Sequence, residues 1–168
     1  MATPAPKPVL TIAVSSRALL HMEDGNPIWA TKGQDAVNAY MREKDNEPLR
    51  PGTAFPLVRK LLALNKDPAK PLVNVVILSR NSPDAGFRIL KSVEHYKLNI
   101  AQAMFSQGSD RFRYVSAVGA QLFLSGNHAD VHKAISNGIA AATITPKETV
   151  HQEDPTIKVA FDGDSVLF

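Results

Sequence analysis

The feature that most constrains the fold is a nearly unbroken apolar run in the middle of the chain, Val73-Asn74-Val75-Val76-Ile77-Leu78. β-Branched residues dominate this run, which is typical of a parallel strand buried on both faces of a sheet. A helix is predicted directly after it, over residues 83–97, with Pro83 in the first turn. From there to residue 144 strand and helix patterns alternate with short connections. The sequence therefore predicts an α/β fold with a doubly wound parallel sheet.

The remaining elements follow from the same patterns. A first strand is expected at about residues 9–15, and helices at 33–43 and 55–62, the second of them capped by Thr53. Further strands are expected at residues 103–106, 122–125 and 139–144, and further helices at 111–118 and 129–137, the last capped by Asn127. The helix after Pro83 is expected to turn Phe87, Leu90 and Val93 toward the core.

Ligands of such sheets bind beyond the carboxyl ends of the strands. Three polar clusters are predicted there, namely Ser15-Ser16-Arg17, Ser79-Arg80-Asn81 and Ser125-Gly126-Asn127. Arg17 and Arg80 can clamp a phosphate from these positions, and exposed or salt-bridged structural arginines are the alternative.

Composition excludes several classes of function. The 168 residues carry a net charge of +3 without a basic run, which argues against a nucleic acid polymer as partner but suits a small phosphate-bearing ligand. The chain has no cysteine, so disulfides and thiol nucleophiles are excluded. The Pro-rich start is not a signal peptide, and no apolar run approaches the ~18 residues of a membrane helix. A cytoplasmic protein with no membrane partner is expected.

The last ten residues read as a short apolar strand that ends in Asp162-Gly163-Asp164. Two acids at positions i and i+2 of a strand point the same way. One can attack a phosphorus atom while the other handles the proton of the leaving group, provided that a divalent cation screens the charge. Asp-Gly-Asp is also ordinary turn chemistry, so the spacing alone leaves both interpretations open.

The start of the chain contains an acid-free copy of this stretch. Residues 11–20 align with residues 158–167, so that Ser15 falls on Asp162 and Arg17 falls on Asp164, while the apolar positions agree. The chain thus carries one strand-loop unit that lacks both acids and the beginning of a second unit that keeps them.

Three segments carry a resemblance to a known family: residues 13–19, 78–86 and 161–168. They resemble the haloacid-dehalogenase-like phosphohydrolase superfamily, and more closely the cytosolic 5'-nucleotidase family within it. The resemblance implies a Rossmannoid fold and magnesium-dependent (Mg²⁺) hydrolysis of nucleoside monophosphates. It also implies a degenerate first half and a catalytic half that begins at the Asp-x-Asp motif.

The resemblance also implies roles for individual residues. Asp162 would be the nucleophile that forms an aspartyl-phosphate, and Asp164 the general acid/base, with both contributing to the magnesium site. Ser79 occupies the phosphate-binding Ser/Thr position and, with Arg80, Asn81 and Arg17, would bind substrate. A cation that neutralises the phosphate is expected at Arg111 or Arg113.

The first half departs from the superfamily pattern. Ser15 and Arg17 replace the aspartates, and Ser125-Gly126-Asn127 stands where an acidic metal-binding pair is expected, so this half lacks the oxygen ligands of a hard cation. The division expected is a Pro-rich tail at residues 1–8, a degenerate α/β domain at 9–145, a linker at 146–156 and the start of an incomplete catalytic half at 157–168.

These departures leave more than one function open. The chain can be a 5'-nucleotidase that is weak or inactive at this length, or a non-catalytic nucleotide- or phosphate-binding module or partner subunit of a complete nucleotidase. A homo-oligomer in which the final strand pairs between two chains is a third alternative.

Smaller signals have simpler explanations. His128 and His132 have a spacing that can bind zinc, although a solvated helix face is the favoured interpretation. Trp29 and Tyr40 can stack on a base, but packing against the core is favoured. No Gly-x-Ser-x-Gly, P-loop or dinucleotide-binding motif is present.

Overall fold

A computed structural model describes residues 8–110, 112–145 and 156–160, with the side chain of Arg113 excepted. Within these residues the chain forms a five-stranded parallel sheet in the order β3-β2-β1-β4-β5. The strands are β1 (Leu10–Val14), β2 (Val73–Ser79), β3 (Gln102–Phe105), β4 (Leu122–Ser125) and β5 (Ala141–Thr143). The predicted α/β fold with a doubly wound parallel sheet is therefore confirmed. Most of the predicted tail and linker, and the acidic end of the final strand, lie outside the described residues.

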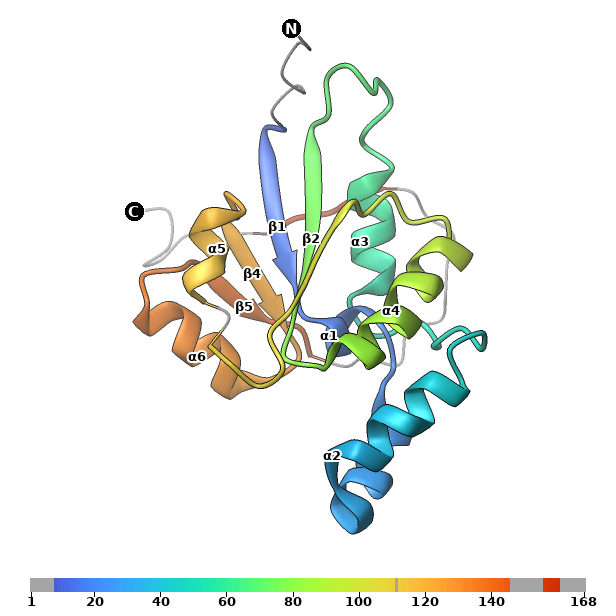
Figure 1. The fold of residues 1–168 in the computed structure, drawn as a ribbon. Helices are drawn as coiled ribbons and strands as arrows, with labels where there is room; N and C mark the ends of the chain where they lie inside the picture. The colour runs from blue at the N-terminus through green and yellow to red at the C-terminus, as the bar shows by residue number, and fades with distance from the viewer. Residues whose placement is uncertain (1–7, 111, 146–155, 161–168) are drawn as a thin grey trace, which may run out of the picture.

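The sheet is the middle of three layers (Figure 1). Alternate residues of the central strands point to opposite faces, so Val14 and Ile77 pack with α3 (Phe55–Leu62) and α4 (Pro83–His95). Val76 and Phe123 pack on the other face, with α5 (Arg113–Ala117) and α6 (His128–Ser136). Because both faces are covered, β2 is buried along almost its whole length, as its unbroken apolar sequence predicts.

The strand order places a topological switch beside β1. The chain runs from β1 outward to β2 and β3, then returns to the other side of β1 to form β4 and β5. The connections that leave β1 and β4 therefore diverge to opposite faces of the sheet, which opens a crevice at their carboxyl ends. This crevice is the position at which the fold favours a ligand.

Helix boundaries agree with the sequence patterns at two caps and differ at a third. The hydroxyl of Ser82 accepts from the backbone of Ala85 at the start of α4, with Pro83 in the first turn, and Asn127 caps α6 as predicted. Thr53 does not cap α3. Ala54 holds that position without a side-chain hydrogen bond, because the backbone of residues 52–54 is bonded to α1 (Ser16–Leu19) instead.

The prediction for the buried face of α4 is wrong at two of its three residues. Phe87 is 64% exposed and Leu90 is 43% exposed, whereas Val93 is buried as expected. The helix instead turns Ala85, Ile89 and Val93 inward, at a spacing of four residues. Gly86 lies beside them and allows a close approach to the sheet, because a Cβ at this position would lie 2.9 Å from the ring of Phe105.

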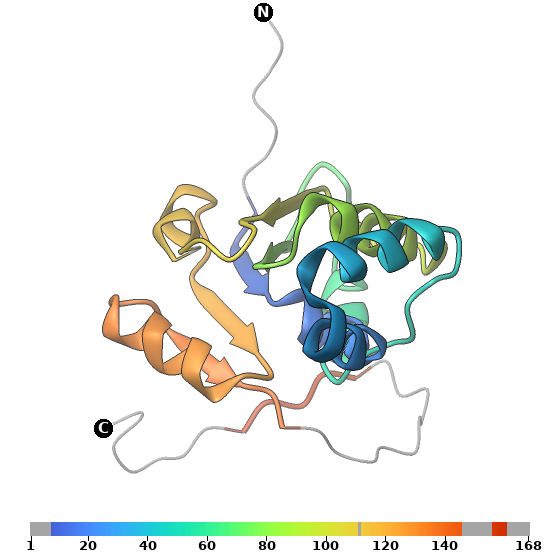
Figure 2. The ribbon, with the colours of Figure 1, turned by 60° about the horizontal axis from the view of Figure 1, so that its bottom comes forward.

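The chain between β1 and α3 contains more helix than its polar sequence indicates. A short 3₁₀ turn, η1 (Glu23–Gly25), leads into α2 (Asn26–Glu43), which bends at Gly33. Gly33 has φ 76° and ψ −173°, a backbone conformation that side chains with a Cβ rarely adopt. The bend separates residues 26–32 from the rest of α2, whose Arg42 forms an ion pair with Asp84 of α4 at 3.0 Å. Figure 2 shows this segment in front of the carboxyl edge of the sheet.

The bend also explains why the prediction that Trp29 packs in the core is wrong. Trp29 lies on the projecting segment and is 62% exposed, while Tyr40, beyond the bend, packs partly buried against the core. No helix of the described part of the chain is long and apolar enough to cross a membrane.

Candidate functional site

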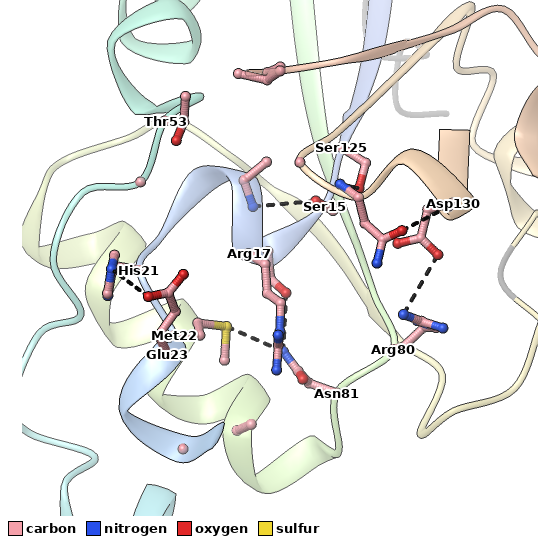
Figure 3. Close-up of a pocket in the computed structure, with 18 of the residues that line it drawn as sticks. Ser15, Arg17, His21, Met22, Glu23, Thr53, Arg80, Asn81, Ser125 and Asp130 are labelled. Carbon is pink, nitrogen blue, oxygen red and sulfur yellow. Dashed lines mark hydrogen bonds and ion pairs between the residues drawn. The ribbon is translucent and has the colours of Figure 1, made fainter. Parts of the chain in front are cut away.

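A cleft of about 1520 Å³ opens at the carboxyl ends of β1 and β4 (Figure 3). Its base is formed where the strands end and by residues 51–52, which are bonded to α1, and its two sides come from residues 21–41 and 53–60. The residues that lie at or just after the strand ends and line the cleft are Ser15, Ser16, Arg17, Arg80, Asn81, Ser125, Gly126 and Asn127. The fold thus brings the three predicted polar clusters, which are far apart in the sequence, to one surface.

The base of the cleft is a hydrogen-bonded cluster of small polar side chains. The hydroxyls of Ser16 and Ser79 lie 2.9 Å apart, and the amide Nδ2 of Asn81 donates to Ser16 Oγ at 3.1 Å. The backbone N–H of Asn81 donates to Ser79 Oγ at 3.1 Å. Ser79 is only 1% exposed and is not among the described residues that line the cleft. Its hydroxyl therefore holds the ends of β1 and β2 together from below the surface.

Two of the predicted substrate-binding cations lie at the cleft. Arg17 is exposed, and its Nη2 donates to Asn26 Oδ1 at 2.9 Å, which joins α1 to the start of α2. Arg80 Nη2 lies 3.7 Å from Asp130 Oδ1 of α6. Figure 3 shows the two guanidinium groups beside different polar neighbours. Both arginines thus face a shared space while each is oriented by a contact of its own.

The donor chemistry of the described cleft does not fit a magnesium ion. Its acidic lining residues are Glu23 and Asp130, and they lie 3.4 Å from the imidazole of His21 and 3.7 Å from the guanidinium group of Arg80, respectively. No group of three or more His, Cys, Asp or Glu side chains that could hold a metal occurs among the described residues. Mg²⁺ requires several oxygen ligands with carboxylates among them, whereas the end of β1 offers hydroxyls and a guanidinium.

The polar side chains at the end of β4 accept hydrogen bonds from the backbone at the start of α6. Ser125 Oγ accepts from the backbone N–H of Asn127 at 3.2 Å, and Asn127 Oδ1 accepts from the N–H of Asp130 at 3.2 Å. These bonds start α6 and turn its first residues toward the cleft. His128 and His132 are exposed on the same helix, in agreement with a solvated face.

Several predicted residues fall outside the description. Asp162, Asp164 and Arg111 lie outside the described residues, and Arg113 is described only as the first residue of α5. Their predicted roles stay predictions.

Sequence reasoning missed most of the side walls of the cleft. His21, Glu23, Asn26 and Lys60 line it, and so does Trp29, which was assigned to the core. The segment that holds four of these residues has no periodic apolar pattern. The bend at Gly33, which separates residues 26–32 from the rest of α2, depends on a positive φ that hydrophobic periodicity does not reveal.

A parallel, doubly wound sheet with a polar, cation-bearing cleft at its switch point defines a Rossmann-like α/β domain, a class of fold that binds small ligands at this position. The family model for 5'-nucleotidase matches residues 1–168. Human cytosolic 5'-nucleotidase 1B is 34% identical over 172 aligned positions, which cover 98% of this chain. The chain therefore belongs to the 5'-nucleotidase family. It spans 28% of the length of that human relative, and no solved structure matches it.

Proposed function

We propose that the protein is a 5'-nucleotidase-type phosphomonoesterase that hydrolyses nucleoside 5'-monophosphates, with its catalytic acids at Asp162-Gly163-Asp164. Family membership supports the reaction class. The observation that carries the assignment is the composition of the described cleft. Arg17 and Arg80 line it at the carboxyl ends of the strands, and no pair of acids follows β1. A cleft of this composition suits an anionic substrate and leaves the chemistry to carboxylates elsewhere in the chain.

The chemistry follows from the resemblance of Asp162 and Asp164 to the Asp-x-Asp motif. The Asp162 carboxylate attacks the phosphorus atom, and Asp164 gives the leaving nucleoside its proton, so an aspartyl-phosphate forms. Asp164 then takes a proton from the water that hydrolyses this intermediate. In this proposal Asp162 and Asp164 would hold Mg²⁺, which would neutralise the charge of the phosphoryl group.

The described domain, residues 9–145, is proposed to be a degenerate haloacid-dehalogenase-like copy that shapes the substrate site. Arg17, Arg80 and Asn81 supply donors at the cleft, and Ser79 holds the strand ends in place. Stabilising the charge of the transferring phosphoryl group supplies most of the catalysis in such reactions. The 168-residue chain by itself is therefore expected to be weak or inactive, in a protein proposed to be cytoplasmic.

The test is phosphate release from a panel of nucleoside monophosphates, with and without Mg²⁺. The assay uses the 168-residue chain and a longer form that contains the downstream catalytic half. Magnesium-dependent release by the longer form that is abolished in Asp162→Asn supports the proposal. Release that survives Asp162→Asn contradicts the assignment of the nucleophile.

The acid-free end of β1 favours a second candidate, in which the chain is a non-catalytic nucleotide- or phosphate-binding module or the partner subunit of a complete nucleotidase. Calorimetry with AMP, IMP and their deoxy forms separates the two candidates. Micromolar binding without turnover in any form supports the module. Light scattering tests the related proposal of a homo-oligomer, which a strictly monomeric chain would exclude.

A further inference from the structure

The projecting segment of α2, residues 26–32, forms a side wall of the cleft and holds a large aromatic side chain there. Trp29 lines the cleft and is 62% exposed. An indole left open to water loses the free energy that burial of its apolar surface would provide. A ligand that covers the ring would recover this free energy on binding.

A cation lies on the same face of this segment. Arg17 Nη2 donates to Asn26 Oδ1 at 2.9 Å, and Asn26 is three residues before Trp29 in the helix. Residues at a spacing of three share a face of a helix, so the side chain that binds the guanidinium group lies on the same face as the indole. Both residues line the cleft, and Asn26 is the hydrogen-bond partner of Arg17 among the described residues. The remaining donors of the guanidinium fork are available to an oxyanion.

We propose that Trp29 and Arg17 form one subsite for a nucleoside monophosphate, in which the base stacks on the indole and the phosphate pairs with the guanidinium group. The identification of the ligand as a nucleoside monophosphate rests on the proposed function. The pairing of an aromatic surface with an anion-binding group comes from the structure. A nucleotide carries its base and its phosphate on opposite sides of one ribose, so a single molecule can engage both groups. Trp29 is thus a binding residue that prefers ligands with an aromatic base.

The composition of the chain makes this subsite directly observable. Trp29 is the single tryptophan among the 168 residues, so indole fluorescence reports on this position alone. The unmodified chain is titrated with AMP, adenosine, ribose 5-phosphate and inorganic phosphate, with excitation at the red edge of the indole band where adenine does not absorb. AMP is expected to quench the fluorescence saturably and at the lowest concentration. Equal responses to AMP and ribose 5-phosphate would overturn the stacking role.

Calorimetry on variants separates the two halves of the subsite. Trp29→Leu is expected to weaken the binding of AMP and adenosine by at least about fivefold, because stacking on an aromatic ring contributes about 1–3 kcal/mol per base. The affinity for inorganic phosphate is expected to stay unchanged. Trp29→Phe keeps a ring and is expected to retain most of the affinity. Arg17→Gln is expected to weaken the binding of AMP and of inorganic phosphate but not the binding of adenosine.

Matched controls come from exposed residues that do not line the cleft. Phe87→Leu removes an aromatic ring of similar exposure, 64%, from α4, and Lys32→Gln removes a positive charge from the same wall segment. Neither change is expected to alter binding of AMP. If Trp29→Leu binds AMP as tightly as Phe87→Leu does, the proposal is overturned.

The binding experiments test the subsite independently of the assay for hydrolysis. If no form of the protein releases phosphate but AMP still quenches Trp29, the proposed function fails and the subsite stands. If AMP neither quenches the indole nor binds in the calorimeter, the subsite is overturned even where hydrolysis is observed.

Discussion

The floor and the wall of the cleft are built in opposite ways. The floor, formed by Ser16, Ser79, Asn81 and the backbone of Gly52 against α1, is closely packed and internally hydrogen-bonded. The wall, residues 26–32, is mostly exposed and is joined to the floor by the bond between Arg17 and Asn26. The hydroxyls of Ser16 and Ser79 in the floor are already paired with each other and with Asn81, whereas the indole of Trp29 in the wall is open to a ligand.

A position at the carboxyl end of a strand therefore does not by itself make a residue available to a ligand. Ser79 and Arg80 are neighbours after β2, yet Ser79 is buried while Arg80 reaches the cleft. Changes in the floor should therefore alter the free energy of unfolding, and changes in the wall should alter binding alone. Three measurements of stability test this division.

The largest effect is expected for Gly52→Ala in the floor. A Cβ on Gly52 would lie 2.6 Å from the carbonyl oxygen of Ala18 and 2.9 Å from the backbone of Leu19. These are backbone atoms held by the bonds from Gly52 N to Leu19 O and from Ala54 N to Ala18 O, so they cannot move aside easily. We expect a loss of about 3 kcal/mol in the free energy of unfolding, measured by urea denaturation.

Gly126→Ala is the matched control, because a Cβ there would meet its nearest neighbour, the carbonyl oxygen of Ile144, at an ordinary 3.9 Å. Equal stability of the two variants would show that the contact between α1 and residue 52 does not constrain the floor.

A smaller loss is expected for Ser79→Ala. The substitution removes the acceptor of the Asn81 N–H and the partner of the Ser16 hydroxyl in a buried site, which costs about 1–3 kcal/mol. Ser136→Ala is the control, since the Ser136 hydroxyl donates to the His132 carbonyl at the exposed surface of α6. A Ser79→Ala variant as stable as the Ser136→Ala variant would mean that the floor is not held by this cluster.

The smallest effect is expected in the wall. Trp29→Leu should change the free energy of unfolding by no more than about 0.5 kcal/mol, because the side chain is 62% exposed. The transition is followed by circular dichroism, since the variant lacks the single tryptophan. Phe123→Leu removes a ring that is fully buried against Phe112 and should cost at least about 1 kcal/mol. A comparable loss in both variants would make Trp29 a packing residue and remove the contrast between wall and floor.

One strand and two helices show how much of the fold the sequence predicts. The run that became β2 is apolar at nearly every position, and such a run requires a strand covered on both faces. The pattern of α4 was less decisive. Its apolar residues permit more than one buried face, and the close approach of the sheet selected the face with Ala85 and Ile89. The bend at Gly33 carried no periodic signal and left the position of Trp29 undetermined.

The candidate site divides in the same way. The sequence placed Arg17, Arg80 and Asn81 at strand ends, and the parallel order of the sheet brings strand ends to one edge, so their convergence was predictable. The contacts of each side chain were not predictable from the sequence. Whether an arginine faces a carboxylate or an open cleft depends on neighbours from other elements, such as Asp130 of α6 beside Arg80.

The sequence is sufficient to predict the parallel α/β sheet, the polar clusters at its carboxyl edge and the relationship of the chain to the 5'-nucleotidase family. These features depend on local periodicity and on short motifs, which are written in consecutive residues. Tertiary packing, by contrast, buries Ser79 in the floor and leaves Trp29 exposed in the wall of the cleft that Arg17 also lines. Burial and orientation of a side chain are set by elements distant in the chain, because packing selects one of several faces that the sequence allows.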